Sequence, residues 1–555
     1  MKTIKLVVTL ATPLRKKYGA PGLARIDKAI RSVSTKDAAR KVTTIYLHLD
    51  DATAMRKYRA VPVTGRPTSA KCKNAIDDLF AALSPDYLVL LGTGDVLPFF
   101  FVPNPSFEAG GDGDSDELVP TDNPYASSKP FKKKRIESYL VPDRVVGRIP
   151  DLPGATDPAA LLEYLAATRS WKLRPPTEFQ DDYLVCCDSW KTSGAACVSY
   201  LSRPSNRLLI SPPTTRTTPG PASKRYAAKF HMIKCHGAQI DASFYGQKGN
   251  RYPDVLSAAD LRKKTTTGTV VGAMCCYGGA VFDPNDPAAV SPGEQPIPTT
   301  YLRQGGYGYF GSTTIAWVGA DDMQCADWVV SAALKAVMNG ASLGRALLES
   351  KQGFVQWIQQ QGNVPDIAEE KTLLQYHLLG DPSIHLVPMA HAPATAQPPA
   401  VARRARRAHA HTTAAQLCAD LPERLVVSRK GKRIAIAAAG AKTLAQPHRP
   451  TDKAAGTAFA ALRRTISVQL RGFVFGSPLV HAVRRRIEQP ELRAARASGV
   501  APAKRRTSGA MASTASYEYY YSARKKTKRV IDARMIKVET DERGRLIRTR
   551  VLASS

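Results

Sequence analysis

The chain has 555 residues, 43% of them hydrophobic and 23% charged, and its formal net charge is +32. This composition excludes a disordered chain, and the length exceeds that of one compact core, so two or three domains are expected. No uninterrupted apolar run of about 18 residues occurs, which argues against a transmembrane helix and against a membrane partner.

The first residues, "MKTIKLVVTLATPLRKKYG", resemble a signal peptide only superficially. Their apolar part is short, contains Pro13, and ends in basic residues instead of a small-residue cleavage site. We therefore interpret this stretch as a first β-strand and expect a cytoplasmic protein. The cysteine pattern agrees, because the number of cysteines is odd and no CxxC pair occurs, which argues against a zinc finger or a disulfide framework. The nine cysteines are at positions 72, 186, 187, 197, 235, 275, 276, 325 and 418.

In the first part of the chain, apolar β-like runs alternate with amphipathic helical runs. This alternation predicts a mostly parallel sheet with helices on both faces. The expected strands are 4–10, 43–49 and 86–92, and the expected helices are 22–33, 70–83 and 157–171.

A second alternating series begins near residue 180. Its central strands are expected to be buried on both faces, because their apolar runs do not alternate with polar residues. The expected strands are 181–188, 230–237, 268–276 and 306–317, and the expected helices are 192–203, 322–340 and 342–361. The sequence thus predicts two adjacent α/β subdomains, residues 1–175 and 176–388.

The composition changes after residue 388. Residues 389–415 are rich in Pro, Ala and Arg and are interpreted as a linker. Residues 416–555 form a basic C-terminal region of uncertain fold, with short β-like runs such as "RVIDARMIKVE". From 401 to 555 there are 34 Lys and Arg against 10 Asp and Glu, so most of the excess positive charge lies here.

Two expected strands end in residues that suit nucleophilic catalysis. "FHMIK" is followed by Cys235, His236 and Gly237, and "TVVGAM" is followed by Cys275 and Cys276. The carboxyl ends of parallel strands share one edge of a sheet, so an imidazole and a thiol are expected to lie close together there. A cysteine nucleophile needs such a base and donors for the oxyanion.

The chain has an apolar run that ends in His-Gly and a later apolar run that ends in Cys, with a glycine soon after. This pattern resembles that of the caspase-like clan of cysteine peptidases (clan CD). "DYLVLLGTGDVLP", "PDRVVGRIP" and "LLQYHLLGDPSIHL" make the chain most similar to the gingipain (C25) family over roughly residues 1–388. The resemblance implies a caspase-like α/β fold and an endopeptidase acting on protein or peptide substrates. It also implies that His236 shuttles the proton and that the backbone N–H groups of Gly237 and of the catalytic cysteine bind the oxyanion.

The spacing to the following glycines does not decide between Cys275 and Cys276 as the nucleophile. Side chains alternate faces along a strand, so one thiol packs inward and the other points outward at the edge. We favour Cys276, which is preceded by a small residue and followed directly by the turn Tyr277-Gly278, and keep Cys275 as the alternative. A zinc site that uses both is not expected, because adjacent cysteines on a strand diverge.

The resemblance also suggests cleavage after basic residues. Trp317 matches a wall of the specificity pocket, and Asp188 is the candidate acid for holding an Arg or Lys side chain. Glu178 and Asp181 are candidates for orienting His236. The run "RRARR" in the linker suggests self-processing by an Arg-cleaving enzyme.

The acidic segment "DGDSDE" places Asp112, Asp114 and Asp116 at alternate positions, as calcium loops do. The glycine and glutamate of an EF-hand are missing, so we expect an exposed acidic loop and no cofactor. Calcium stays a candidate ligand only because gingipains bind it.

The basic clusters of the C-terminal region suggest a second partner. Four tyrosines, 517, 519, 520 and 521, precede "ARKKTKR", and tyrosines beside cations can stack on bases. The alternative function is therefore a catalytically silent caspase-like scaffold whose basic region binds nucleic acid or another polyanion.

Overall fold

The computed structural model describes most of the chain up to residue 389 and several segments beyond it. The described residues are 3–108, 113–132, 135–218, 225–361, 363–389, 423–427, 433–434, 473, 478–486, 513–526, 530–541 and 545–555. None of the helices in these ranges combines the length and the apolar character that a membrane crossing requires. The linker, including "RRARR", lies outside them apart from Met389.

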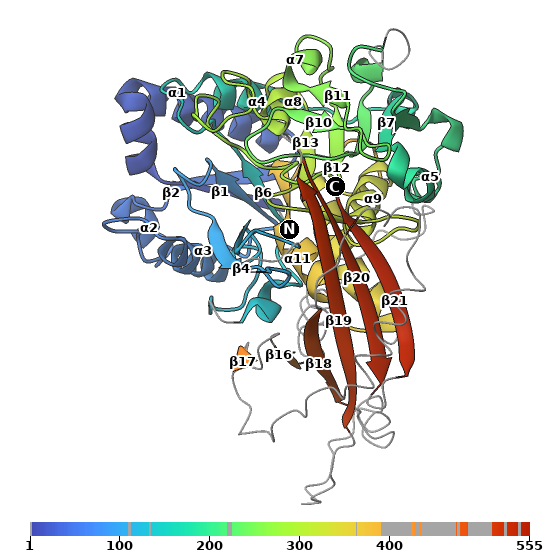
Figure 1. Ribbon diagram of the computed structural model, residues 1–555. Coiled ribbons are helices and arrows are strands. Elements are labelled where there is room, and N and C mark those ends of the chain that lie inside the picture. The colour runs from blue at the N-terminus through green and yellow to red at the C-terminus, as the bar shows by residue number, and fades with distance from the viewer. Residues whose placement is uncertain are drawn as a thin grey trace, which may run out of the picture.

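Ten strands form one central sheet, which helices flank (Figure 1). The prediction of an α/β fold with mostly parallel strands is confirmed. Across the sheet, the strands are β2 (Val42–His48), β1 (Thr3–Thr9), β3 (Tyr87–Leu91), β6 (Val146–Ile149), β15 (Tyr376–Gly380), β13 (Gly308–Ser312), β12 (Val270–Ala273), β9 (Phe230–Lys234), β7 (Asp182–Cys187) and β8 (Leu209–Ser211).

The sheet consists of two groups of five parallel strands. The first group runs from β2 to β15, and the second runs from β13 to β8. The groups meet where β15 lies antiparallel to β13. Every residue of β9 and β12 is buried, as apolar runs in the middle of a parallel sheet predict.

The two predicted subdomains share this sheet, because β15 lies in the second subdomain in sequence but belongs to the first group of strands. A buried ion cluster reinforces the connection. In β1, the Nζ atom of Lys5 lies 2.5 Å from a carboxylate oxygen of Asp37 and 2.6 Å from one of Asp381, just beyond β15. The segment "LLGDPS" therefore ties the end of the α/β region to its first strand.

The helices largely follow the apolar periodicity, with one difference at the N-terminus. Element α1 consists of two helical segments joined by a kink at Gly19, whose conformation is non-helical (φ 69°). The first segment begins at Ala11 and was not predicted, whereas the predicted helix 22–33 lies in the second segment. The helices are α1 (Ala11–Ala39), α2 (Ala52–Arg56), α3 (Ser69–Leu83), α4 (Ala159–Ser170), α5 (Lys191–Tyr200), α7 (Ala258–Leu261), α8 (Ile297–Arg303), α9 (Ala326–Met338), α10 (Leu343–Gln360) and α11 (Ile367–Gln375). Two short hairpins complete this region, β4 (Phe100–Pro103) with β5 (Leu118–Thr121), and β10 (Ser243–Tyr245) with β11 (Asp254–Ser257).

The described parts of the C-terminal region form an antiparallel sheet that lies against the second half of the α/β region (Figure 1). Its first strand, β14, comes from the α/β region itself. The order is β14 (Trp317–Gly319), β21 (Leu546–Ser554), β20 (Ile531–Asp541), β19 (Ser513–Lys526), β18 (Leu479–Arg486), β16 (Glu423–Val427) and β17 (Arg433–Ile434). The long strands β19, β20 and β21 bring the last residue of the sequence close to β12 and β13 (Figure 1).

The tyrosines proposed to stack on bases are buried in this sheet. Tyr517 is 9% exposed, and Tyr519, Tyr520 and Tyr521 are 2% exposed or less. They pack against Ile536, Val538 and Met535 of β20, so their ring faces are not open to a nucleic acid. The basic runs "VARRARR" and "AKRRTSG" lie outside the described residues.

Candidate active site

The two strand ends that carry the predicted dyad are neighbours. Strand β9 pairs with β12 in parallel, with Ile233 opposite Ala273. His236 and Cys276 each follow three residues later, so both lie at the carboxyl edge of the sheet. The backbones touch there, because a Cβ atom on Gly237 would lie only 2.0 Å from the carbonyl oxygen of Cys276. Only glycine allows this approach.

The adjacent cysteines face different surroundings. Cys275 belongs to the main core, and its Sγ atom lies 3.6 Å from the carbonyl oxygen of Ile233. Cys276 belongs to a separate apolar cluster with Trp317, and its Sγ atom lies 3.3 Å from the backbone nitrogen of Ala316. The chain turns directly afterwards at Tyr277, whose φ is 54°. The choice of Cys276 as the nucleophile stays a prediction.

His236 is held on one side and has a free nitrogen on the other. Its Nε2 atom lies 3.0 Å from Oε1 of Gln247, and its ring lies 4.5 Å from that of Trp190. Because the amide oxygen of Gln247 only accepts, Nε2 carries the proton, and Nδ1 keeps the lone pair of a base. Nδ1 is buried without a hydrogen-bond partner. Burial lowers the pKa of His236 to about 4, so the ring is neutral at pH 7.

The two acids expected to orient His236 lie elsewhere. Glu178 and Asp181 precede β7, whereas His236 follows β9, which runs parallel to it, so they lie at opposite edges of the sheet. Glu178 binds Arg174 at 2.7 Å, and Asp181 lies 3.4 Å from Arg207. The expectation for these acids was wrong, and Gln247 contacts the imidazole instead.

Asp188 and Trp317 do lie at the edge that carries His236 and Cys276. In the register of β7 and β9, Cys186 pairs with Lys234, so Asp188 and His236 follow at the same level. The carboxylate of Asp188 lies 3.4 Å from Nζ of Lys191, which is itself mostly exposed. Trp317 is fully buried in β14, and its Nε1 atom has no hydrogen-bond partner.

Comparison with known proteins adds a family to this geometry. Residues 228–387 match the model of peptidase family C25, and this range contains both β9 and β12. This stretch is therefore similar to peptidase family C25. The match indicates a cysteine peptidase.

One solved structure, described as "Structure of Protease", is 15% identical to the chain, with a TM-score of 0.46. The alignment covers 70% of this chain and 79% of that chain. Among curated proteins, none matched the chain.

The sheet edge that carries His236 and Cys276 is covered by a segment from outside the matched range 228–387. Strand β21 pairs antiparallel with β14, so that Ser554 lies opposite Trp317 and Leu552 lies opposite Gly319. The next residue, Ser555, donates from its backbone nitrogen to the carbonyl oxygen of Ala316 at 3.0 Å. Its own carbonyl oxygen accepts a hydrogen bond from the backbone N–H of Cys276.

Side chains of the C-terminal sheet complete the apolar cluster around Cys276. We call this group the Cys276 cluster. Its buried members are Cys276, Ile315, Trp317, Cys325, Ile367, Ala368, Tyr520, Ala533, Met535 and Leu552. Cys276 is 3% exposed as a result, and burial raises the pKa of its thiol to about 12. No motif in the sequence indicates these contacts, which join residues far apart in the chain.

The acidic loop is only partly exposed, in contrast to expectation, because Asp114 is buried whereas Ser115 and Glu117 are exposed. Asp112 lies outside the described residues, whereas Asp114 is fully buried and binds the ammonium group of Lys371. Asp116 accepts hydrogen bonds from the hydroxyl of Tyr277 at 2.6 Å and from the backbone nitrogen of Ile315 at 2.9 Å. Within the described ranges, no group of His, Cys, Asp or Glu side chains is arranged to hold a metal ion.

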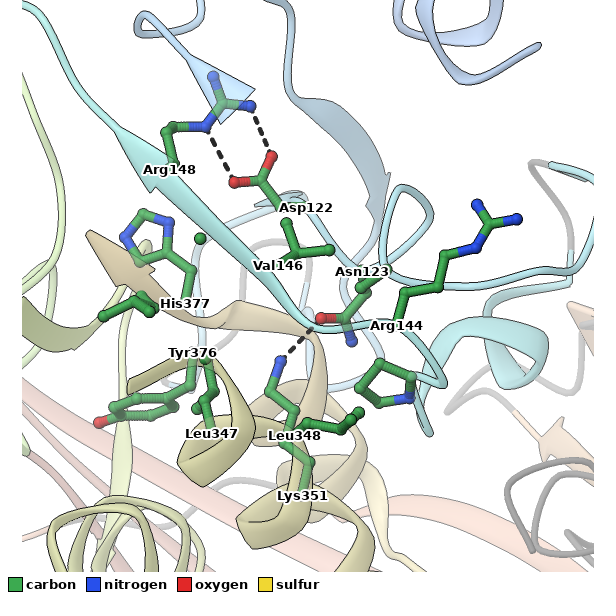
Figure 2. A pocket seen from close by; sticks show the side chains of 15 residues that line it. Asp122, Asn123, Arg144, Val146, Arg148, Leu347, Leu348, Lys351, Tyr376 and His377 are labelled. Atoms are coloured by element: carbon green, nitrogen blue, oxygen red, sulfur yellow. Dashed lines mark hydrogen bonds and ion pairs between the residues drawn. The ribbon is translucent and has the colours of Figure 1, made fainter. Parts of the chain in front are cut away.

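A pocket lined by both charged and apolar side chains lies between β6, β15 and α10 (Figure 2). Arg148 binds Asp122 through two hydrogen bonds of 2.9 and 2.6 Å. The Nζ atom of Lys351 donates to Oδ1 of Asn123 at 2.7 Å, and His377 lines the same pocket. The pocket contains none of the residues that the sequence assigns to the reaction.

Proposed function

We propose that the chain is a cysteine endopeptidase that uses Cys276 as nucleophile and His236 as base and acid. One observation carries the proposal. A buried imidazole with an unpaired Nδ1 follows β9, beside the strand end that carries Cys276, inside the range that matches peptidase family C25. A positioned base next to a thiol is the arrangement that activates a cysteine for acyl transfer.

In the proposed reaction, the Cys276 thiol gives its proton to Nδ1 of His236 as the sulfur attacks the peptide carbonyl. The carbonyl oxygen becomes an oxyanion, which the backbone N–H of Cys276 and that of Gly237 stabilise. Collapse of this intermediate breaks the C–N bond, and His236 returns the proton to the leaving amine. Water then attacks the thioester, His236 takes a proton from it, and the acid product leaves with the thiol restored.

The neighbouring cysteine provides a matched control for this assignment. Cys276→Ala should abolish both peptide cleavage and labelling by a peptidyl acyloxymethyl ketone, whereas Cys275→Ala should retain both. Labelling can be located by mass spectrometry of the proteolytic fragment. If label is incorporated, and to the same extent in the wild-type chain and in Cys276→Ala, the nucleophile is another residue.

Cleavage after Arg or Lys is the specificity that Asp188 supports, because its carboxylate lies at the level of His236 with only a long contact to Lys191. An acid at this place would bind a basic side chain by a charge-assisted hydrogen bond. Asp188→Asn should lower kcat/KM for peptides with Arg before the cleaved bond by about 10-fold or more and leave apolar peptides unaffected. A library in which basic residues are not preferred would exclude this specificity.

Self-processing in the linker belongs to the same proposal and rests on the run "RRARR" in the sequence. Incubation of the purified chain should yield fragments whose new ends lie within residues 403–407. The Cys276→Ala chain should stay intact under the same conditions. Fragments with the same ends from both chains would point to a contaminating peptidase.

A further inference from the structure

We propose that residues 546–555 occupy the edge of β14 where a substrate chain would bind, and that they keep Cys276 and His236 inaccessible until they are displaced. The inference rests on the proposed function, because that function makes the edge of β14 beside Cys276 the place where a substrate chain binds. It concerns regulation of that site by the chain's own C-terminal sheet.

The first support is the position of Ser555. Its carbonyl oxygen accepts the N–H of Cys276, and this N–H is the donor expected to bind the oxyanion of a substrate. Its backbone nitrogen is tied to Ala316 at 3.0 Å. Ser555 therefore occupies the place of the substrate residue whose carbonyl group would be attacked.

The second support is the backbone pairing that leads to Ser555. An extended peptide binds an exposed strand by adding a strand to it, with main-chain hydrogen bonds that do not depend on sequence. Residues 552–554 pair with β14 in this way, antiparallel and in continuous register. A substrate chain could form the same bonds only after β21 had left β14.

The third support is the packing of side chains over Cys276. Leu552 is 1% exposed and belongs to the Cys276 cluster, together with Met535 and Ala533 of the neighbouring strand β20. These contacts exclude water and reagents from the thiol. A protonated thiol in such a place is unreactive, because the thiolate is the nucleophile.

The fourth support is a separate contact on the histidine side. Gln247, which holds Nε2 of His236, donates from its own Nε2 to Oδ2 of Asp532 in β20 at 2.6 Å. The hydroxyl of Tyr252 donates to the same carboxylate oxygen at 2.7 Å. The C-terminal sheet is thus anchored beside both members of the dyad, and His236 is only 1% exposed.

The test places a charge at Leu552 in the full chain. Leu552→Glu should displace β21, because burial of a leucine favours the packed state roughly ten-fold or more and a buried carboxylate opposes it. The matched control is Ile547→Glu, on the same strand but 55% exposed and outside the pairing with β14. Two quantities are measured, the rate of alkylation of Cys276 by iodoacetamide and the rate of peptide cleavage.

We expect both rates to rise at least about ten-fold in Leu552→Glu and to stay at the wild-type level in Ile547→Glu. Cys275, which is buried in the main core, is the internal standard and should stay unlabelled. If Cys275 is labelled as well, the Leu552→Glu variant has unfolded. The deciding variant is then Asp532→Ala, which removes the anchor beside His236 and should raise both rates by the same factor.

The two proposals fail in different ways. Faster alkylation without peptide cleavage would support the occluding role of residues 546–555 and refute the peptidase function. A wild-type chain that cleaves peptides as fast as Leu552→Glu would support the peptidase function and overturn the occluding role. Unchanged alkylation of Cys276 in the folded variants would also overturn it.

Discussion

A buried ion pair below the dyad leads to a quantitative prediction. Lys234, the last residue of β9, lies two positions before His236, and its Nζ atom lies 2.6 Å from Oδ1 of Asp327 in the first turn of α9. Both side chains are fully buried. Oδ2 of Asp327 also accepts the backbone N–H of Gly319, at the end of β14, at 2.8 Å. The pair therefore fixes the histidine strand relative to the strand that β21 covers.

Asp327→Asn keeps the shape of the side chain but leaves the ammonium group of Lys234 buried without its counter-charge. Breaking a buried pair in this way costs about 3–5 kcal/mol. When Lys234→Met is already present, the same change removes no attraction and should cost only about 1 kcal/mol, the value of a weakened hydrogen bond.

Urea unfolding followed by tryptophan fluorescence measures both costs. All five tryptophans lie between residues 171 and 357, so the signal reports on the α/β region. The control is Glu294→Gln, which breaks the partly exposed pair with Arg262 and should cost less than about 1 kcal/mol. Equal costs of Asp327→Asn in the wild-type and Lys234→Met chains would refute the coupling.

Three further predictions concern the dyad and the pocket shown in Figure 2. Gly237→Ala, made in the Leu552→Glu chain, should lower turnover by about 100-fold, because a Cβ atom 2.0 Å from the carbonyl oxygen of Cys276 would force the strand ends apart by about 1 Å. Gly353→Ala is the control and should not change turnover, because no atom lies within 4 Å of its Cβ position. Equal effects of the two substitutions would refute this argument. Burial lowers the pKa of Lys351 from 10.5 to about 7. Between pH 7 and 10.5 the unfolded chain therefore binds more protons than the folded chain, and the free energy of unfolding should rise by at most about 1.4 kcal/mol per pH unit. Urea titrations should show a flatter profile for Lys351→Met, and an unchanged slope would contradict the shift. Asp116→Ala should lower kcat about ten-fold with little change in KM, because the hydroxyl of Tyr277 loses the carboxylate that it contacts at 2.6 Å. Asp116→Asn should restore part of the rate. A change in KM alone would indicate a role in substrate binding instead.

The sheet and the neighbouring strand ends could be predicted because their signal is local. Strands buried on both faces appear as short apolar runs, and the residues that follow them must lie at one edge of a parallel sheet. This reasoning placed His236, Cys276 and Asp188 correctly at one edge. The same rule, applied to Glu178 and Asp181, would have excluded them, because residues that precede a parallel strand lie at the opposite edge.

Contacts between distant segments left no such signal. Lys371 binds Asp114 across 257 positions, and Gln247, which binds His236, is an amide in a loop with no motif around it. The run "RVIDARMIKVE" was identified as β-like, and β20 lies there, but nothing in its composition indicates that Met535 and Asp532 pack beside the dyad.

The order of the strands along the chain has a consequence for biosynthesis. The ten-stranded sheet is complete once β15 has been made, whereas β21 is translated later, and Ser555 lies 175 positions after Gly380. At about 5–20 residues per second, a ribosome needs roughly 10–35 seconds for that distance. Each new molecule therefore passes through an interval in which Cys276 and β14 have been made but β21, which pairs with β14, has not.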